Sequence, residues 1–317
     1  MTQQYGNQAA EIKKQSFFSR LAKDLKKYKG LYLLALPVFI YYAVFVITPL
    51  LGNVIVFQDY SLTKGILGSK FVGLKHFTDF VTSMNFGRVV KNTLVINITS
   101  LIFGFPAPII LALLIHELKS VRYSRTVQTV TYLPHFISLV VLCGIVRDFT
   151  AADGLIGSFV ARLTGVNMDM LGQSKYFVPI YVISGIWQGV GWGSIVYLAA
   201  LTSLDSSLYE AASLDGAGKW KQFVHVTFPG ILPTILTMLI MRIGQLVTVG
   251  SEKILLLYNP NIYDTSDVIQ TYLYRKGMID QSYSFSTAVG IFNSLISCVL
   301  LIFANTASKK LNDVSLW

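Results

Sequence analysis

Residues 210–233 read EAASLDGAGKWKQFVHVTFPGILP, a polar and charged stretch that lies between two long apolar segments of the chain. Because charged side chains are costly in lipid, this stretch predicts a loop in water between two membrane spans. Its Glu-Ala-Ala start favours a helix, and Asp215-Gly216 favours a sharp turn. Residues 219–225 predict a second short amphipathic helix that ends at Pro229. The stretch therefore predicts a compact knob of two short helices joined by a glycine.

The composition also indicates a membrane protein. The chain has 317 residues, of which 53% are hydrophobic and only 13% are charged. A soluble domain carries about 25% charged residues, so we expect an integral membrane protein. Lys and Arg number 26 against 16 Asp and Glu. They gather at loops and ends beside apolar runs, which favours retention on the cytoplasmic side of a membrane and not nucleic-acid binding.

The apolar runs predict an all-α integral membrane protein with six spans. They lie at about residues 31–57, 92–115, 126–146, 177–201, 231–249 and 285–307. Residues 58–91, 147–175 and 250–284 then lie outside, whereas the link after the second span and the loop at residues 203–230 lie inside. The chain divides into a basic cytoplasmic segment (1–30), a six-helix membrane domain (31–308) and a cytoplasmic tail (309–317).

The first 30 residues carry seven basic side chains and place the N-terminus in the cytoplasm by their charge. Two interpretations of this segment stay open: an amphipathic helix on the inner membrane surface, or a basic tail. No leader cleavage is expected. Cys143 and Cys298 stand in apolar runs without partners at metal-binding or disulfide spacing, so we expect neither a disulfide nor a metal. No cofactor is expected either.

The loop at residues 203–230 resembles the EAA loop of permease subunits in ATP-driven (ABC) importers. That pattern is EAA, three residues, Gly, nine residues and Ile-x-Leu-Pro. Five positions match this pattern, and Val226 and Phe228 replace its Ile and Leu. The resemblance implies that the matching residues, together with Asp215, contact a separate ATPase: Glu210, Ala211, Ala212, Gly216 and Pro229. The chain has no phosphate-binding GxxxxGK[ST] loop, because Trp220 follows the lysine of Gly216-Ala-Gly-Lys. We therefore expect a transporter subunit that is not an enzyme and takes its energy from a partner.

Further strings are similar to carbohydrate-importer permeases of the LplB type. They are YLPHFIS (132–138), WQGVGWGSIVYLAAL (187–201), LLLYNPNIY (255–263), DVIQTYLYRKG (267–277) and TAVGIFNS (287–294). The resemblance implies an oligosaccharide or related glycan as substrate, a bacterial plasma membrane, and four kinds of partner: a second and different permease, an ATPase dimer, an external lipid-anchored binding protein and membrane lipid. Ser251, where an aromatic residue is expected, departs from the pattern.

Sugar recognition calls for aromatic faces and polar groups in a mostly apolar cavity. The candidates within the third, fourth and fifth spans are His135, Ser138, Gln188, Trp192, Arg242 and Gln245. Arg242 either contacts substrate, or it hydrogen-bonds carbonyls or extends its charged end towards the cytoplasm. Gly185, Gly189 and Gly193 recur every four residues and favour the close approach of a second helix.

The external segments around residues 73–80 and 258–275 are candidates for docking the binding protein, either as contacts or as caps over the helix ends. Their interface-forming side chains are Tyr258, Tyr263, Tyr272, Tyr274 and Arg275. Two other functions remain as alternatives: an ABC importer for a non-sugar solute, and an ion-driven secondary transporter. The second is disfavoured because Asp and Glu are absent from the interior of the predicted spans.

Overall fold

The computed structural model describes residues 26–248 and 250–312. Most of the basic segment 1–30, and the end of the tail at 313–317, lie outside these residues. Within them the regular secondary structure is helical apart from one two-stranded ribbon. Five segments are long and apolar enough to cross a membrane, and a sixth is a pair of helices bent by 99°. The all-helical membrane architecture expected from the sequence is thus confirmed.

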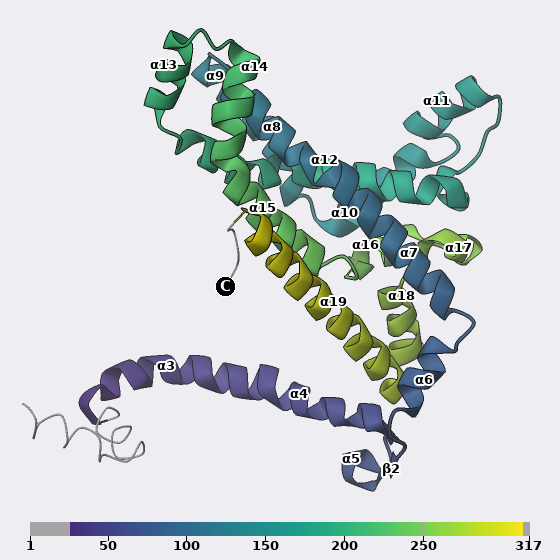
Figure 1. Ribbon diagram of the computed structural model, residues 1–317. Coiled ribbons are helices and arrows are strands. Elements are labelled where there is room, and N and C mark those ends of the chain that lie inside the picture. Colours follow the sequence, from purple (N-terminus) through teal and green to yellow (C-terminus); the bar gives the residue numbers. More distant parts are fainter. Residues whose placement is uncertain (1–25, 249, 313–317) are drawn as a thin grey trace, which may run out of the picture.

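The first span forms an arm that projects from the rest of the molecule (Figure 1). It runs through α3 (Lys29–Tyr42), the π-helical η1 (Ala43–Ile47), α4 (Thr48–Gly52) and the 3-10 turn η2 (Asn53–Phe57). Among the described residues of α3, η1 and α4, no side chain is buried, whereas Val56 in η2 is. The arm is therefore anchored to the bundle at its η2 end.

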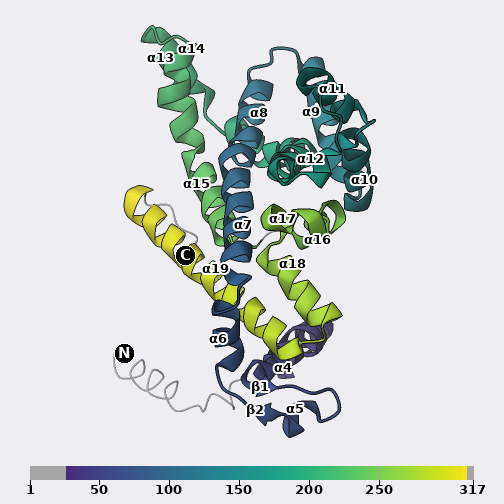
Figure 2. The ribbon, with the colours of Figure 1, turned by 90° about the vertical axis from the view of Figure 1, so that its right-hand side faces the viewer.

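The remaining elements form the bundle and its two ends (Figure 2). In the first half they are β1 (Gln58–Asp59), α5 (Gly65–Gly68), β2 (Lys70–Phe71), α6 (Lys75–Val81), α7 (Phe86–Thr99), η3 (Ser100–Gly104), α8 (Pro106–His116), α9 (Val121–Tyr132), η4 (Leu133–Phe136), α10 (Leu139–Thr150), α11 (Leu155–Thr164) and η5 (Met170–Gly172). In the second half they are α12 (Ser174–Thr202), α13 (Ser206–Leu214), α14 (Lys219–Gln222), η6 (Phe223–Thr227), α15 (Phe228–Gly244), α16 (Ser251–Leu257), η7 (Pro260–Ile262), α17 (Tyr263–Ser266), α18 (Ile269–Tyr274), η8 (Arg275–Ile279) and α19 (Tyr283–Asn312).

Three prolines sit inside continuous spans instead of ending them. Pro49, Pro106 and Pro229 each follow a π-helical segment by two residues. A proline lacks the N–H of a regular helix and its ring collides with the carbonyl four residues earlier, and a wider π turn moves that carbonyl aside. The expected end of the second loop helix at Pro229 is therefore wrong. That helix runs on, so that the fifth span extends over Lys219–Gly244.

The third span also differs from the straight helix expected over residues 126–146. It is a bent pair, Val121–Phe136 followed by Leu139–Thr164. The break falls in the string Tyr132-Leu-Pro-His-Phe-Ile-Ser138, where Pro134 supports a 3-10 turn and Ser138 starts the next helix by accepting a hydrogen bond from the N–H of Val141. The proline and the capping serine explain why the direction of the chain changes here.

The bundle is held by three apolar clusters. One joins α7, α10, α12 and α16 around Phe177 and Ile254. A second joins α6, α7, α18 and α19 around Phe80, whose ring lies 5.3 Å from that of Phe292. The third joins α8, α12 and α15 around Leu201. The long central helix α12 packs along α8 and is shared by two clusters, so that it is the element against which a site in this bundle would be built.

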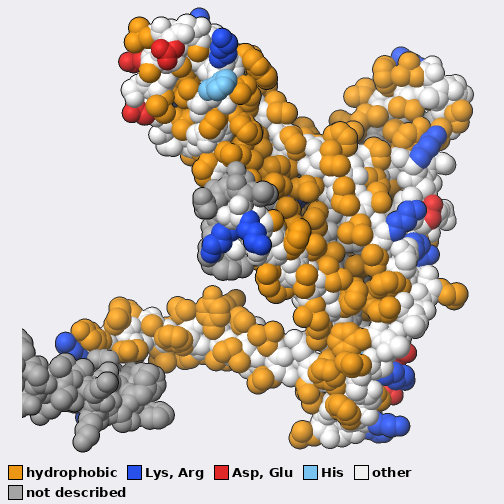
Figure 3. Space-filling view, viewed as in Figure 1, with side chains coloured by type: hydrophobic (Ala, Val, Ile, Leu, Met, Phe, Trp, Pro, Cys, Tyr) orange, Lys and Arg blue, Asp and Glu red, His pale blue; other side chains and the backbone are white. Residues whose placement is uncertain are grey.

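On the face shown in Figure 3, charged side chains gather at the knob formed by α13 and α14, which we call the EAA end, and along the opposite edge, which we call the far end. Lys309 and Lys310 form a further basic group at the end of α19. Hydrophobic side chains dominate the arm and the middle of the bundle. This distribution fits a lipid layer crossed by the bundle, with water at both ends.

Candidate functional site

The EAA loop folds as two helices joined at a glycine. The N–H of Ala217 donates to the carbonyl of Ala212 (2.9 Å), and the N–H of Gly216 donates to that of Ser213 (3.1 Å). This pair of bonds is a Schellman motif, which needs a left-handed residue at its turn. Gly216 supplies it with a φ of +72°. The backbone therefore requires glycine at this position, as its place in the motif suggested.

Side chains fix the two helices of the knob to each other. Gln222 donates to Ser213 Oγ (2.9 Å), and the Tyr209 hydroxyl lies 3.0 Å from that of Thr227. At the start of α13, Asp205 Oδ1 accepts from the N–H of Ser207 (2.9 Å). Hydrogen bonds from the backbone N–H and the hydroxyl of Ser207 lower the pKa of Asp205, so this N-cap carboxylate is charged at neutral pH. The knob is thus a preformed unit.

The knob also reaches the link that follows α8. Lys219 Nζ lies 3.0 Å from Glu117 Oε2, although both side chains are largely exposed. An exposed ion pair contributes at most about 1 kcal/mol, so it orients the knob more than it stabilises it. Glu210 lines a recess of about 860 Å³ between the knob and this link. Leu214 and Trp220 stand 89% and 74% exposed on the knob, an apolar surface in water.

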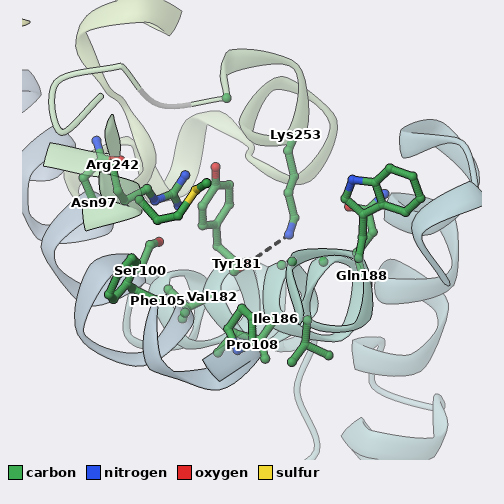
Figure 4. Close-up of a pocket in the computed structure, with 18 of the residues that line it drawn as sticks. Asn97, Ser100, Phe105, Pro108, Tyr181, Val182, Ile186, Gln188, Arg242 and Lys253 are labelled. Atoms are coloured by element: carbon green, nitrogen blue, oxygen red, sulfur yellow. Dashed lines mark hydrogen bonds between the residues drawn. The ribbon is translucent and has the colours of Figure 1, made fainter. Parts of the chain in front are cut away.

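A cavity of about 520 Å³ lies beside α12 in the middle of the bundle (Figure 4). It is lined by residues of α7, η3, α8, α12, α15 and α16. The glycines of α12 open it: Gly185, Gly189 and Gly193 all belong to its lining. A Cβ at Gly193 would press on the ring of Pro108, whereas one at Gly189 would meet nothing within 4 Å. The glycine ridge therefore makes room as well as allowing α8 to approach.

Two cations face this cavity. Lys253 is buried, and its Nζ donates to the carbonyl of Tyr181 (2.9 Å) while lying 4.7 Å from the centre of that ring. Arg242 comes from the last turn of α15, and no described residue accepts a hydrogen bond from its guanidinium. Within the described part of the chain, the lining contains no Asp or Glu. The cavity is therefore positively charged.

The structure brings some of the predicted pathway residues together. Gln188, Trp192 and Arg242 line the cavity. His135 stacks on Trp192 with ring centres 4.5 Å apart and planes 2° apart. Ser138 instead caps α10, and Gln245 ends α15; neither is in the lining.

The sequence reasoning missed Lys253, Tyr181 and Asn97. Lys253 stands in a segment expected to be external, and only its position before the apolar run Ile254-Leu-Leu-Leu257 signals burial. Tyr181 and Asn97 belong to apolar spans in which a lone polar residue is the available signal.

At the far end, several of the predicted docking residues form one cluster. The rings of Tyr258 and Tyr263 stack at 5.1 Å, and the guanidinium of Arg275 lies 4.5 Å from the centre of the Tyr263 ring. Tyr272 is buried against Phe80, whereas Tyr274 is 43% exposed. The cluster thus has both a packed and an exposed side.

Beneath this cluster lies a buried carboxylate. Asp267 is fully buried and accepts from Arg275 Nη2 (2.7 Å) and from Arg88 Nη2 (3.3 Å). The Thr271 hydroxyl donates to it as well (2.8 Å). Because Arg88 belongs to α7, this carboxylate ties the first half of the bundle to the segment that carries the tyrosines.

Comparison with known proteins gives consistent results. The family model described as "Binding-protein-dependent transport system inner membrane component" matches residues 80–312. The chain is 40% identical over 294 residues to protein LplB of Bacillus subtilis, covering 92% of each. It is 39% identical over 309 residues to the polygalacturonan/rhamnogalacturonan transport system permease protein YteP of the same organism, covering 97% of this chain and 96% of that one.

A solved bacterial ABC transporter that imports the acidic polysaccharide alginate is also similar. One crystal structure matches with a TM-score of 0.85 and 40% identity, over 92% of this chain and 99% of that one. A second, in complex with an alginate pentasaccharide-bound periplasmic protein, matches with a TM-score of 0.86 and 40% identity, over 94% and 100%. These matches confirm the LplB-type resemblance inferred from the sequence strings.

Proposed function

Because this chain belongs to the family of binding-protein-dependent transport system inner membrane components, we propose that it conducts an acidic oligosaccharide through the cavity beside α12. It is a permease subunit of an ATP-driven sugar importer and not an enzyme. It works with a second permease, a separate ATPase and a periplasmic solute-binding protein. The family assignment replaces the alternative of an ion-driven secondary transporter.

The charge of the cavity is the observation that carries the substrate proposal. Arg242 and Lys253 supply two cations, and the described lining supplies no carboxylate. Uronate residues carry one carboxylate each, and a carboxylate accepts strong hydrogen bonds from guanidinium and ammonium groups. Trp192 adds an aromatic face on which a sugar ring can stack. The similar transporters of alginate and of polygalacturonan/rhamnogalacturonan act on polysaccharides that contain uronate residues, which supports an acidic glycan as the substrate.

Substitution of the free cation tests this proposal. Arg242→Gln is expected to lower the initial rate of oligouronate uptake by about 10-fold or more, because a hydrogen bond to a charged group contributes about 1.5–3 kcal/mol. The measurement uses proteoliposomes that contain the whole importer and its binding protein. Arg242→Lys keeps the charge and should restore most of the rate.

Lys309→Gln serves as the control, since it removes an exposed cation from the end of α19, away from the cavity lining. Uptake by this variant should match that of the wild type. Wild-type uptake by Arg242→Gln would overturn the proposal of an acidic substrate in this cavity. An Arg242→Lys variant as slow as Arg242→Gln would assign the arginine a shape-dependent role instead of a charge-dependent one.

The EAA end is proposed to face the cytoplasm and to bind the ATPase. Its support is the resemblance of the loop, the preformed knob, and the exposed Leu214 and Trp220, which suit a groove on a partner. Lys119, Arg122 and Arg125, in the link after α8 and in α9, lie on the same side of the predicted membrane and fit retention inside. Both termini then lie in the cytoplasm.

The far end is proposed to receive the binding protein. The stacked Tyr258 and Tyr263 and the adjoining Arg275 are side-chain types that are enriched in interfaces. Support also comes from the similar alginate transporter, whose structure includes a periplasmic protein. Tyr272 packs inside the bundle and would act on docking only by holding this surface in place.

The arm is proposed to pack against the second permease. It is apolar, its described side chains from α3 to α4 are unburied, and it leads away from its own bundle. A photo-crosslinking amino acid at Leu36 or Phe45, which are 49% and 67% exposed, is therefore expected to capture the second permease in the assembled importer. Capture is measured by a shift in electrophoretic mobility and identified by peptide mass.

The control for the arm is the same labelled chain expressed without its partner permease, which should lose the shifted band. Attachment to lipid alone, in the assembled importer, would contradict this role of the arm. The docking of the ATPase and the transport assay do not depend on this result.

A further inference from the structure

A second cavity lies on the opposite side of α12 from the first. It has a volume of about 290 Å³ and is lined by residues of α10, α11, η5 and α12. Ile183 and Trp187 each stand two residues from Gly185, and are therefore turned roughly 160° away from it around the helix axis. The two cavities thus share a helix but face different surroundings, and the second is not part of the proposed substrate pathway.

The chemistry of this cavity is apolar at its walls and cationic at one end. Its lining includes Ile145, Phe149, Ile156, Ile180, Ile183 and Trp187. Tyr176, also in the lining, lies under the ammonium of Lys175, which is 4.7 Å from the ring centre. From Lys175 to Trp187 the helix rises about 18 Å, close to half of the roughly 30 Å hydrocarbon thickness of a bilayer. The apolar lining therefore extends up to about 18 Å along α12 from the ammonium of Lys175.

The helix beside this cavity has the features of a helix that lies on a membrane surface. Leu155, Phe159 and Leu163 recur every four residues along α11 and are 73%, 61% and 71% exposed. Such an apolar stripe is suited to the boundary between headgroups and acyl chains. The start of α11 is held tightly on the end of α10, because a Cβ at Gly157 would collide with the carbonyl of Ala151. The wall of the cavity is thus a fixed part of the fold.

From this arrangement we propose that the cavity holds an acyl chain of a phospholipid from the leaflet opposite the EAA loop, with the phosphate beside Lys175. An apolar cavity of this kind is not filled by water and offers no hydrogen bond to a sugar or a peptide. The aromatic Tyr176 and the basic Lys175 are the residue types that meet headgroups at membrane surfaces. The assignment to that leaflet rests on the proposed function, since it uses the proposed orientation.

The test uses the whole importer, with its second permease and ATPase, in nanodiscs of phosphatidylethanolamine and phosphatidylglycerol. A trace of phosphatidylglycerol carries a photoactivatable diazirine on one acyl chain, and labelled peptides are mapped by mass. Labelling is expected to concentrate on α10, α11 and α12. Ile183→Trp and Ile156→Trp, which fill the cavity from two different helices, should each lower it by about tenfold, the loss expected when two or more buried methylene groups are displaced.

Val299→Trp is the matched control, since Val299 is 65% exposed on α19 and lies outside the cavity. It should leave the labelling of α10 to α12 unchanged. Lys175→Gln should weaken the labelling by the anionic lipid. Equal labelling of α19 and of the cavity, or no effect of either filling variant, would overturn the proposal and indicate ordinary bilayer contact.

The same nanodiscs separate this proposal from the proposed function. ATPase activity stimulated by glycan-loaded binding protein reports on the importer, and it does not use the lipid label. Absence of stimulation in the wild type would reject the acidic-glycan importer while the pattern of labelling still decides whether the lipid site exists.

Discussion

Gly216→Asp should lower coupled transport by about tenfold or more while leaving the chain folded in the membrane. Gly216 has a φ of +72°, and a residue with a Cβ in this left-handed region costs roughly 1–2 kcal/mol. The chain can relieve that strain by opening the two bonds of the Schellman motif, which would change the angle between α13 and α14. Because we propose that the knob couples transport by fitting the ATPase, the expected fall corresponds to at least about 1.4 kcal/mol of lost fit.

The matched control lies two residues further on. Gly218 is the N-cap of α14 with a φ of −68°, a position where Asp is favoured, and added Cβ atoms at Gly216 and at Gly218 would both meet nothing within 4 Å. Gly218→Asp adds the same charge without the backbone strain and should retain transport and the ATPase. The readouts are uptake and the amount of ATPase that purifies with the chain in mild detergent. Normal uptake by Gly216→Asp would reject the coupling role of the loop.

The largest effect on stability is expected from Asp267→Ala. This fully buried carboxylate lies 2.7 Å from Arg275 and 3.3 Å from Arg88, and its removal leaves two partly buried guanidinium groups without their counterion. Breaking a buried ion pair costs about 3–5 kcal/mol, and the partial exposure of both arginines favours the lower end of that range. The measurement is the midpoint temperature of thermal unfolding of the purified importer. It is monitored as the decrease of the importer's peak in size-exclusion chromatography after heating.

Asp280→Ala provides the comparison, since the Lys276–Asp280 pair in the same region is exposed and spaced i,i+4. It should change the free energy of unfolding by less than about 0.5 kcal/mol. Asp267→Leu combined with Arg275→Met should recover part of the loss, because an apolar pair needs no counterion. An Asp267→Ala variant as stable as Asp280→Ala would show that the buried carboxylate does not hold the far end together.

The apolar runs were sufficient to predict an all-helical membrane protein, because the length of a span is dictated by the thickness of lipid. Local rules failed at prolines. Pro229 was expected to end a helix and instead lies within one, since a π turn before it moves the obstructing carbonyl. At Pro134 the error is the reverse, because a straight span was expected and the chain bends there. Hydropathy measures how apolar a segment is and does not register a change of direction.

The candidate site was predictable only in part. Gly216 could be placed in a turn from its neighbours, because left-handed geometry is a local property of the backbone. Trp192 and Arg242 were noticed as polar or aromatic residues inside spans. Lys253 was not, because its burial depends on the packing of α16 against α10 and α12, which are distant in the sequence. Contacts of that kind are set by tertiary structure and leave no periodic signal.

The unburied arm has a consequence for the life of the subunit in the cell. With the arm packed against the second permease, as we propose, the chain completes its structure only on assembly, so its apparent stability depends on the concentration of its partner. Copies made in excess would keep that helix exposed to lipid and to membrane proteases. Degradation of such orphan copies would then set the ratio of the two permeases, and synthesis of the scarcer one would determine how many importers the membrane holds.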